Sequence, residues 1–145
     1  MKILLFGGSG QLGFELKKRA SDLSFELFSP VTKEVDITVD KAEEEPDRAY
    51  AINAEGVKNV ATACAEHGAR LIHISTDYVF DGSLGRALTE EDVTNPISVY
   101  GASKLLGEEH ARAILGEKGV ILRTQALYGQ KGAYDAKALY GTRSS

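Results

Sequence analysis

Short apolar runs alternate along the chain with segments in which apolar residues recur at helical spacing. The apolar runs are typical of parallel strands that are buried on both faces. We predict strands at 2–6, 25–28, 70–76 and 119–124. We predict helices that begin after Gly13 and that span 43–68 and 100–115. Strands that alternate with helices indicate an α/β fold with a doubly wound parallel sheet.

The segment Ser29–Asp40 departs from this alternation. It joins the second predicted strand to the helix over 43–68, yet it is polar and contains no apolar run. A doubly wound sheet would place a further helix and strand there, a unit of about 25 residues. We therefore predict a truncated sheet that lacks one unit near residues 38–39. We assign residues 1–132 to a single domain and residues 133–145, which show weak periodicity, to an irregular tail.

Composition narrows the class of protein. The chain has 145 residues and a net charge of −4, which gives no electrostatic case for binding nucleic acid or an anionic membrane. No segment has the features of a signal peptide or the length of a membrane span. Cys64 is the single cysteine, which fits a reducing compartment. We expect a cytoplasmic protein.

The first predicted strand runs into a glycine-rich turn. Glycine at such a turn permits unusual backbone angles, close approach of the backbone to a pyrophosphate, and tight packing of helix on strand. The N–H groups at the start of the next helix favour the anion. The alternative is a tight turn without a ligand. We predict a Rossmann-like dinucleotide site formed by Gly7, Gly8, Ser9, Gly10, Gln11, Leu12 and Gly13.

The type of dinucleotide depends on the end of the second strand. An NAD site usually has an acidic residue there, but this strand ends in Phe28 and Ser29. Lys33 suits a 2′-phosphate, which favours NADPH over NADH, although a merely solvated lysine is an equal alternative. We also assign Asp36, near the adenine, and Ile37 to the cofactor-binding residues.

Tyr100 and Lys104 lie four positions apart at the start of a predicted helix, so they share one helix face. A phenol has a pKa of about 10, and a nearby ammonium stabilises the phenolate and lowers that pKa toward neutrality. The pair could therefore act as a general acid, and the lysine could also bond the cofactor ribose. A simple surface pair is the alternative.

Three polar residues, Ser75, Thr76 and Asp77, follow one another where the strand over 70–76 ends. Ligands of open α/β sheets gather at the carboxyl ends of strands, so a hydroxyl there could hydrogen-bond a substrate carbonyl. The alternative is a turn that satisfies its own backbone.

Taken together, these features resemble the extended short-chain dehydrogenase/reductases, in the branch that reduces nucleotide-activated keto sugars. The resemblance covers most of residues 1–132. It is carried by Phe6–Gly13, Val39–Ala61, His73–Gly82, Asn95–Glu108 and Arg123–Gly129.

The resemblance implies an NAD(P)H-dependent reduction of the 4-keto group of dTDP-4-dehydrorhamnose to dTDP-rhamnose. Tyr100 would be the proton donor, and Lys104 would orient the ribose and lower the tyrosine pKa. Thr76 would bind the substrate carbonyl, with Asp77 beside it, and Ser75 would contact the cofactor. Asn53, Arg123 and Thr124 match family positions in the central helix and the last strand.

The chain also departs from the family. Family members carry a helix, a mid-sheet strand and an Asn-Ala-Ala-x-Tyr-Thr segment between the positions of Thr38 and Val39, and a substrate domain beyond residue 132. These departures leave two alternatives: a non-catalytic NADP-binding regulatory protein similar to the methionine adenosyltransferase β subunit, or another keto-sugar reductase or epimerase. A homodimer, and magnesium between subunits, follow from the resemblance only. No Cys and His cluster has the spacing of a metal site.

The remaining polar residues are given ordinary roles. We expect His67 and His110 on helix surfaces and His73 packed within its strand. We expect Glu108 and Glu109 on an exposed helix face.

Overall fold

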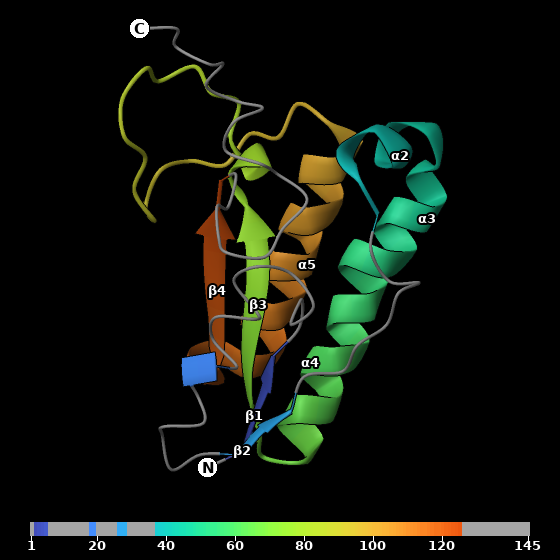
Figure 1. The fold of residues 1–145 in the computed structure, drawn as a ribbon, viewed down its shortest axis with the longest axis vertical. Coiled ribbons are helices and arrows are strands. Elements are labelled where there is room, and N and C mark those ends of the chain that lie inside the picture. The colour runs from blue at the N-terminus through green and yellow to red at the C-terminus, as the bar shows by residue number, and fades with distance from the viewer. Residues whose placement is uncertain (1, 6–17, 20–25, 29–36, 126–145) are drawn as a thin grey trace, which may run out of the picture.

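The computed structural model describes residues 2–5, 18–19, 26–28 and 37–125. Its centre is a four-stranded parallel sheet in the order β2-β1-β3-β4 (Figure 1). The strands are β1 (Lys2–Leu5), β2 (Glu26–Phe28), β3 (Arg70–Thr76) and β4 (Gly119–Thr124). The predicted strands over 70–76 and 119–124 are confirmed to the residue.

The register shows that, among the described residues, β1 and β3 pair with no strand between them. β1 pairs with β3 directly, with Ile3 opposite Arg70 and Leu5 opposite Ile72. β3 pairs with β4 from Leu71 to Thr76. The described part of β1 therefore contacts only the first half of β3, in the middle of the sheet where the family resemblance implied another strand.

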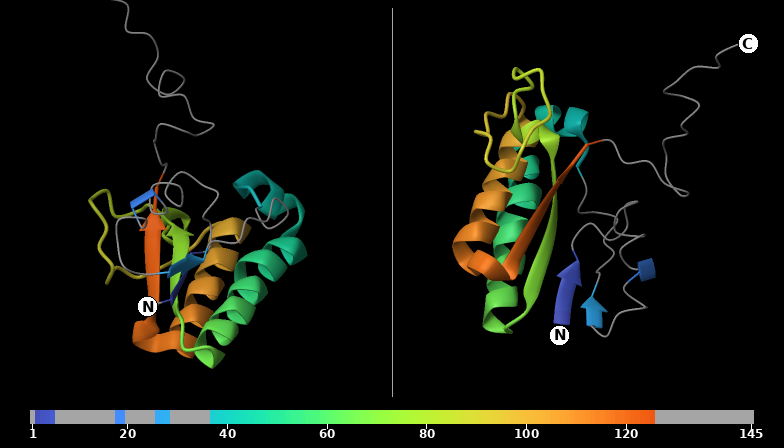
Figure 2. Two further views of the ribbon diagram at one scale, coloured as in Figure 1. Left: turned by 60° about the horizontal axis from the view of Figure 1, so that its bottom comes forward. Right: turned by 90° about the vertical axis from the view of Figure 1, so that its left-hand side faces the viewer.

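Helices α4 (Gly56–Glu66) and α5 (Val99–Leu115) lie side by side on one face of this sheet (Figures 1 and 2). α4 ends as its sequence predicts: Gly68 adopts φ +65°, and the next N–H, that of Ala69, donates to the Cys64 carbonyl at 2.8 Å. The core between α4, α5 and the sheet contains Val57, Ala61, Cys64, Leu71, Ala111 and Leu115.

The single helix predicted over 43–68 is wrong at its start. The helical segment begins with α2 (Val39–Glu44), breaks at Glu45, and resumes as α3 (Pro46–Tyr50), the π-helical turn η1 (Ala51–Glu55) and α4. Proline disfavours helical geometry in the residue before it, which explains the break at Glu45.

The segment directly before α2 contributes to the packing of the protein, although its sequence is mostly polar. Thr38 caps α2 by accepting a hydrogen bond from the Lys41 N–H, at 3.4 Å. Ile37 is 3% exposed and packs with Ala42 and Ala49 in a second small core. Ser29–Asp40 was expected to contain no apolar run, and Ile37 contributes a single buried side chain from this segment.

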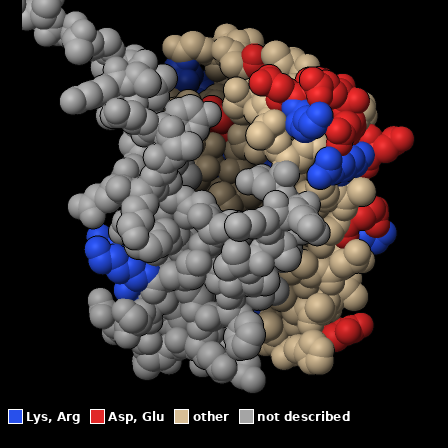
Figure 3. Space-filling view, turned by 45° about the vertical axis from the view of Figure 1, so that its right-hand side comes forward, with Lys and Arg blue, Asp and Glu red and all other residues tan. Residues whose placement is uncertain are grey.

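Charged side chains gather over α2 and α3 (Figure 3). Lys41 contacts Glu44 at 2.9 Å and Glu45 at 3.2 Å, and Arg48 contacts Glu45 at 2.8 Å. Such exposed pairs contribute little to stability. Among the residues that the structure describes, no helix has the length and apolar character needed to cross a membrane.

Candidate active site

Thr76 closes β3 at the edge of the sheet where the candidate site was predicted. Its hydroxyl accepts a hydrogen bond from the Tyr78 N–H and donates one to the Asp77 carboxylate, both at 3.2 Å. Thr76 thereby caps the short 3₁₀ turn η2 (Asp77–Val79), and it is 7% exposed. The turn that satisfies its own backbone, the alternative considered for this motif, is therefore present.

The first turn of α5 brings Tyr100 to the same edge. The Ser98 hydroxyl caps this helix by accepting from the Gly101 N–H at 3.0 Å. Gly101 packs so closely on the Tyr78 carbonyl that a Cβ there would collide with it. The rings of Tyr78 and Tyr100 then meet edge to face, with centroids 5.8 Å apart.

Lys104 fixes the same helix to the strand. Its ammonium donates a hydrogen bond to the Ile74 carbonyl of β3 at 2.7 Å. Tyr100 and Lys104 are both partly buried. They are therefore not a simple surface pair, because α5 presents them to the carboxyl half of β3.

Asn53 joins this group from η1. Its amide donates to the Ser103 hydroxyl at 3.0 Å, and that hydroxyl donates to the Tyr100 carbonyl at 2.9 Å. Gly107 allows the close approach, because a Cβ at that position would collide with the Asn53 carbonyl. Single π-helical turns are frequent at functional sites, and this one turns Asn53 toward α5.

His73 and Ser75 are each 3% exposed on β3. His73 Nε2 and Ser75 Oγ have no hydrogen-bond partner among the residues that the structure describes. Burial, and then the positive charge of Lys104, lower the pKa of His73 to about 3, so its ring is neutral at physiological pH. The prediction that His73 packs within its strand is confirmed.

Glu108 contradicts its prediction. It is fully buried rather than on an exposed face, and it accepts three hydrogen bonds from the Arg123 guanidinium, at 2.6, 3.0 and 3.1 Å. Arg112 contacts it at 3.4 Å, and Arg123 lies over the Phe80 ring at 4.9 Å. Burial of a carboxylate requires such a partner, and the partner lies on another element. Glu109 is exposed, as predicted.

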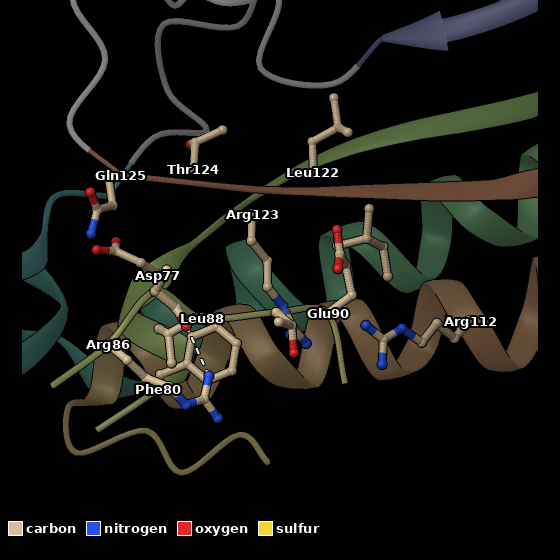
Figure 4. Close-up of a pocket in the computed structure, with 13 residues that line it drawn as sticks. Asp77, Phe80, Arg86, Leu88, Glu90, Arg112, Leu122, Arg123, Thr124 and Gln125 are labelled. Carbon is tan, nitrogen blue, oxygen red and sulfur yellow. Dashed lines mark hydrogen bonds between the residues drawn. The ribbon is translucent and has the colours of Figure 1, made fainter. Parts of the chain in front are cut away.

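A cavity of about 710 Å³ adjoins this ion pair (Figure 4). Asp77, Thr124 and Gln125 lie at one end and Arg112 at the other, with Arg123 between them. The segment Arg86–Glu90 also lines the cavity. The cavity therefore begins beside the strand-end residues predicted to bind substrate.

The predicted cofactor residues Gly7, Gly8, Ser9, Gly10, Gln11, Leu12, Gly13, Lys33 and Asp36 lie outside the described residues. Ile37 is described, and its side chain packs in the second core. The structure brings together Ser75, Thr76, Asp77, Tyr100 and Lys104 at the carboxyl end of β3.

Comparison with known proteins identifies this arrangement. The family model described as the RmlD substrate binding domain matches residues 37–141. The chain belongs to the RmlD family. This match includes the strand end, the Tyr100 helix and the Glu108–Arg123 pair.

Two relatives within the RmlD family show how far the similarity extends. The chain is 36% identical to the dTDP-4-dehydrorhamnose reductase of Escherichia coli K12, over 96% of this chain and 56% of the relative. It is 38% identical to the solved dTDP-4-dehydrorhamnose reductase of Clostridium acetobutylicum, with a TM-score of 0.79 over 91% of this chain and 56% of that one.

A third relative contains a cofactor. The structure of the Bacillus anthracis dTDP-4-dehydrorhamnose reductase in complex with NADP is 33% identical, with a TM-score of 0.78, over 90% of this chain and 55% of that one. The fold class predicted from the sequence, a Rossmann-like parallel sheet, is confirmed by these neighbours.

The chain spans about half the length of the relatives it matches. The alignment with the E. coli relative extends over 167 residues, which exceeds the 145 residues of this chain. That relative therefore has residues within the aligned span that have no counterpart here.

Proposed function

We propose that this chain carries the proton-donating part of a dTDP-4-dehydrorhamnose reductase, which reduces the 4-keto group of dTDP-4-dehydrorhamnose to dTDP-rhamnose with NAD(P)H. The main structural support is the contact between α5 and β3. The hydrogen bond from Lys104 to the Ile74 carbonyl holds the Tyr100 helix against the strand that ends in Thr76. The names of the relatives support the substrate.

The nicotinamide cofactor would supply the hydride. The donor set suits its ribose, because an ammonium at Lys104 and a phenol at Tyr100 are groups that hydrogen-bond sugar hydroxyls. The Ser75 hydroxyl, which has no hydrogen-bond partner among the described residues, lies on β3. We favour NADPH, because the B. anthracis relative was solved with NADP and because Lys33 suits a 2′-phosphate.

Each residue of the site has a defined task in this proposal. Tyr100 donates a proton to the substrate oxygen when the keto carbon is reduced. Lys104 stabilises the phenolate that remains. The Thr76 hydroxyl turns from its Asp77 contact to the substrate oxygen, while the hydrogen bond from the Tyr78 N–H keeps that hydroxyl at the strand end. Burial, and then the charge of Lys104, lower the pKa of His73 to about 3, so its ring is too weak a base to compete for the proton.

A cytoplasmic location is part of the proposal. Cys64 is a buried thiol, and burial raises its pKa, which keeps it protonated and unreactive. A buried, protonated thiol is compatible with a reducing compartment such as the cytoplasm.

The test compares NADPH oxidation by the wild-type chain and by Tyr100→Phe, with dTDP-4-dehydrorhamnose as substrate. We expect the variant to lose about 100-fold or more in turnover, the usual contribution of a positioned general acid. The exposed Tyr50 of α3 provides the control, and Tyr50→Phe should retain the wild-type rate.

Equal rates for wild type and Tyr100→Phe would overturn the role of Tyr100. Binding of NADPH without turnover of any nucleotide sugar would instead support the non-catalytic regulatory alternative.

A further inference from the structure

The helix that carries Tyr100 is capped by a residue from a different element. Glu43, on α2, accepts hydrogen bonds through Oε1 from the Val99 N–H at 2.7 Å and from the Tyr100 N–H at 3.3 Å. These donors lie 56 and 57 positions from Glu43 along the chain. Glu43 is thus a tertiary cap on α5.

Together with Ser98, this cap satisfies three N–H groups at the start of α5. The first four N–H groups of a helix have no partner within the helix. Glu43 accepts from the Val99 and Tyr100 N–H groups, and the Ser98 hydroxyl accepts from the Gly101 N–H at 3.0 Å. The regular i→i−4 bonds of the helix begin with the Ala102 N–H, which donates to the Ser98 carbonyl at 2.9 Å. Because the cap is a carboxylate, it also interacts favourably with the positive end of the helix dipole.

The cap acts on Tyr100 itself, whose backbone is held on both sides. Glu43 accepts from its N–H, and the Ser103 hydroxyl donates to its carbonyl at 2.9 Å. Its ring packs edge to face on Tyr78 and contacts the Ile37 core. A displacement of the first turn of α5 therefore moves the phenol away from the end of β3.

We propose that Glu43 is a positioning residue for Tyr100, a role that rests on the proposed reductase function. Its carboxylate holds the first turn of α5 in the position from which the phenol reaches the substrate oxygen. α2 is thereby part of the support of the site rather than a peripheral helix.

The test uses the whole chain with Glu43→Ala, Glu43→Gln and the control Glu44→Ala. Glu44 is the neighbouring exposed carboxylate, and it contacts only Lys41 among the described ion pairs. We expect Glu43→Ala to lower kcat about tenfold or more with little change in KM, because small misplacements of a reacting group are costly. Glu43→Gln keeps an acceptor oxygen and should restore most of kcat, and Glu44→Ala should match wild type.

A structural measurement separates this proposal from the proposed function. Hydrogen exchange of the Tyr100 amide, and the ring-proton NMR shifts of Tyr78 and Tyr100, do not require turnover. We expect Glu43→Ala to accelerate that exchange and to move those shifts, well below its unfolding temperature, while Glu44→Ala does neither.

The outcomes are distinct. If the wild type does not turn over but Glu43→Ala shows the NMR changes, the reductase function fails and the positioning of Tyr100 stands. If Glu43→Ala lowers only the unfolding temperature and leaves kcat, exchange and ring shifts unchanged, Glu43 is a structural cap and the positioning proposal is overturned.

Discussion

His73 occupies the centre of β3 and is almost fully buried, and within the described part of the chain its Nε2 has no hydrogen-bond partner. Its pKa is lowered to about 3, first by burial and then by the charge of Lys104. In the unfolded chain a histidine has a pKa of about 6.5, so the unfolded state binds more protons between these two values. Stability therefore falls as the pH decreases through this window.

We predict that the free energy of unfolding decreases from pH 6.5 toward pH 4.5. The slope should approach about 1.4 kcal/mol per pH unit, the value for one proton. His73→Leu removes the titrating ring and should flatten that slope. Urea denaturation at several pH values measures it, and an unchanged slope in the variant would contradict the assignment to His73.

At the scale of elements, the Glu108–Arg123 pair joins α5 to β4. Arg123 is 15% exposed and Glu108 is fully buried, whereas Arg112, the second cation on Glu108, is 57% exposed. Removing one partner of a buried ion pair leaves an uncompensated charge, which costs more than the pair itself contributes.

Arg123→Met should therefore lower the free energy of unfolding by about 3 kcal/mol or more. The double variant Glu108→Met with Arg123→Met should regain much of that loss, since no buried charge remains. Arg112→Met is the matched control and should cost less than about 1 kcal/mol because it is largely exposed. Equal losses for the Arg123 and Arg112 variants in urea denaturation would refute the account.

The same elements show which features could be predicted from local sequence. β3, β4 and α5 follow from runs and periodicities within their own residues, and their bounds agree closely with the structure. α2 is only six residues long and mostly polar, so no periodicity marks it. Tyr100, Lys104 and Thr76 were found from motifs, and the structure brings them to one sheet edge.

What could not be predicted depends on distant partners. Glu108 has the local pattern of an exposed helix residue, and only Arg123 of β4 explains its burial. Glu43 was expected to open a helix, but its function as a cap depends on Val99 and Tyr100. Because Glu43 is followed directly by two more glutamates, the sequence alone does not indicate which of the three makes that contact.

At the scale of the whole molecule, the chain spans about half the length of its relatives. The sheet pairs β1 directly with β3, and the aligned span of the E. coli relative is longer than this chain. The internal segment that we predict to be missing near residues 38–39 remains a prediction. The proposed reduction requires that the nicotinamide cofactor and the keto sugar both bind beside Tyr100.

The most direct test of that claim follows the hydride. The chain is incubated with NADPH that carries deuterium at the transferred position of C4, together with dTDP-4-dehydrorhamnose, and the sugar product is analysed by mass spectrometry and NMR. We predict dTDP-rhamnose with deuterium at C4, formed by the wild type and lost in Tyr100→Phe. NADPH binding without deuterium in the sugar, or equal labelling by the Tyr100→Phe variant, would contradict it.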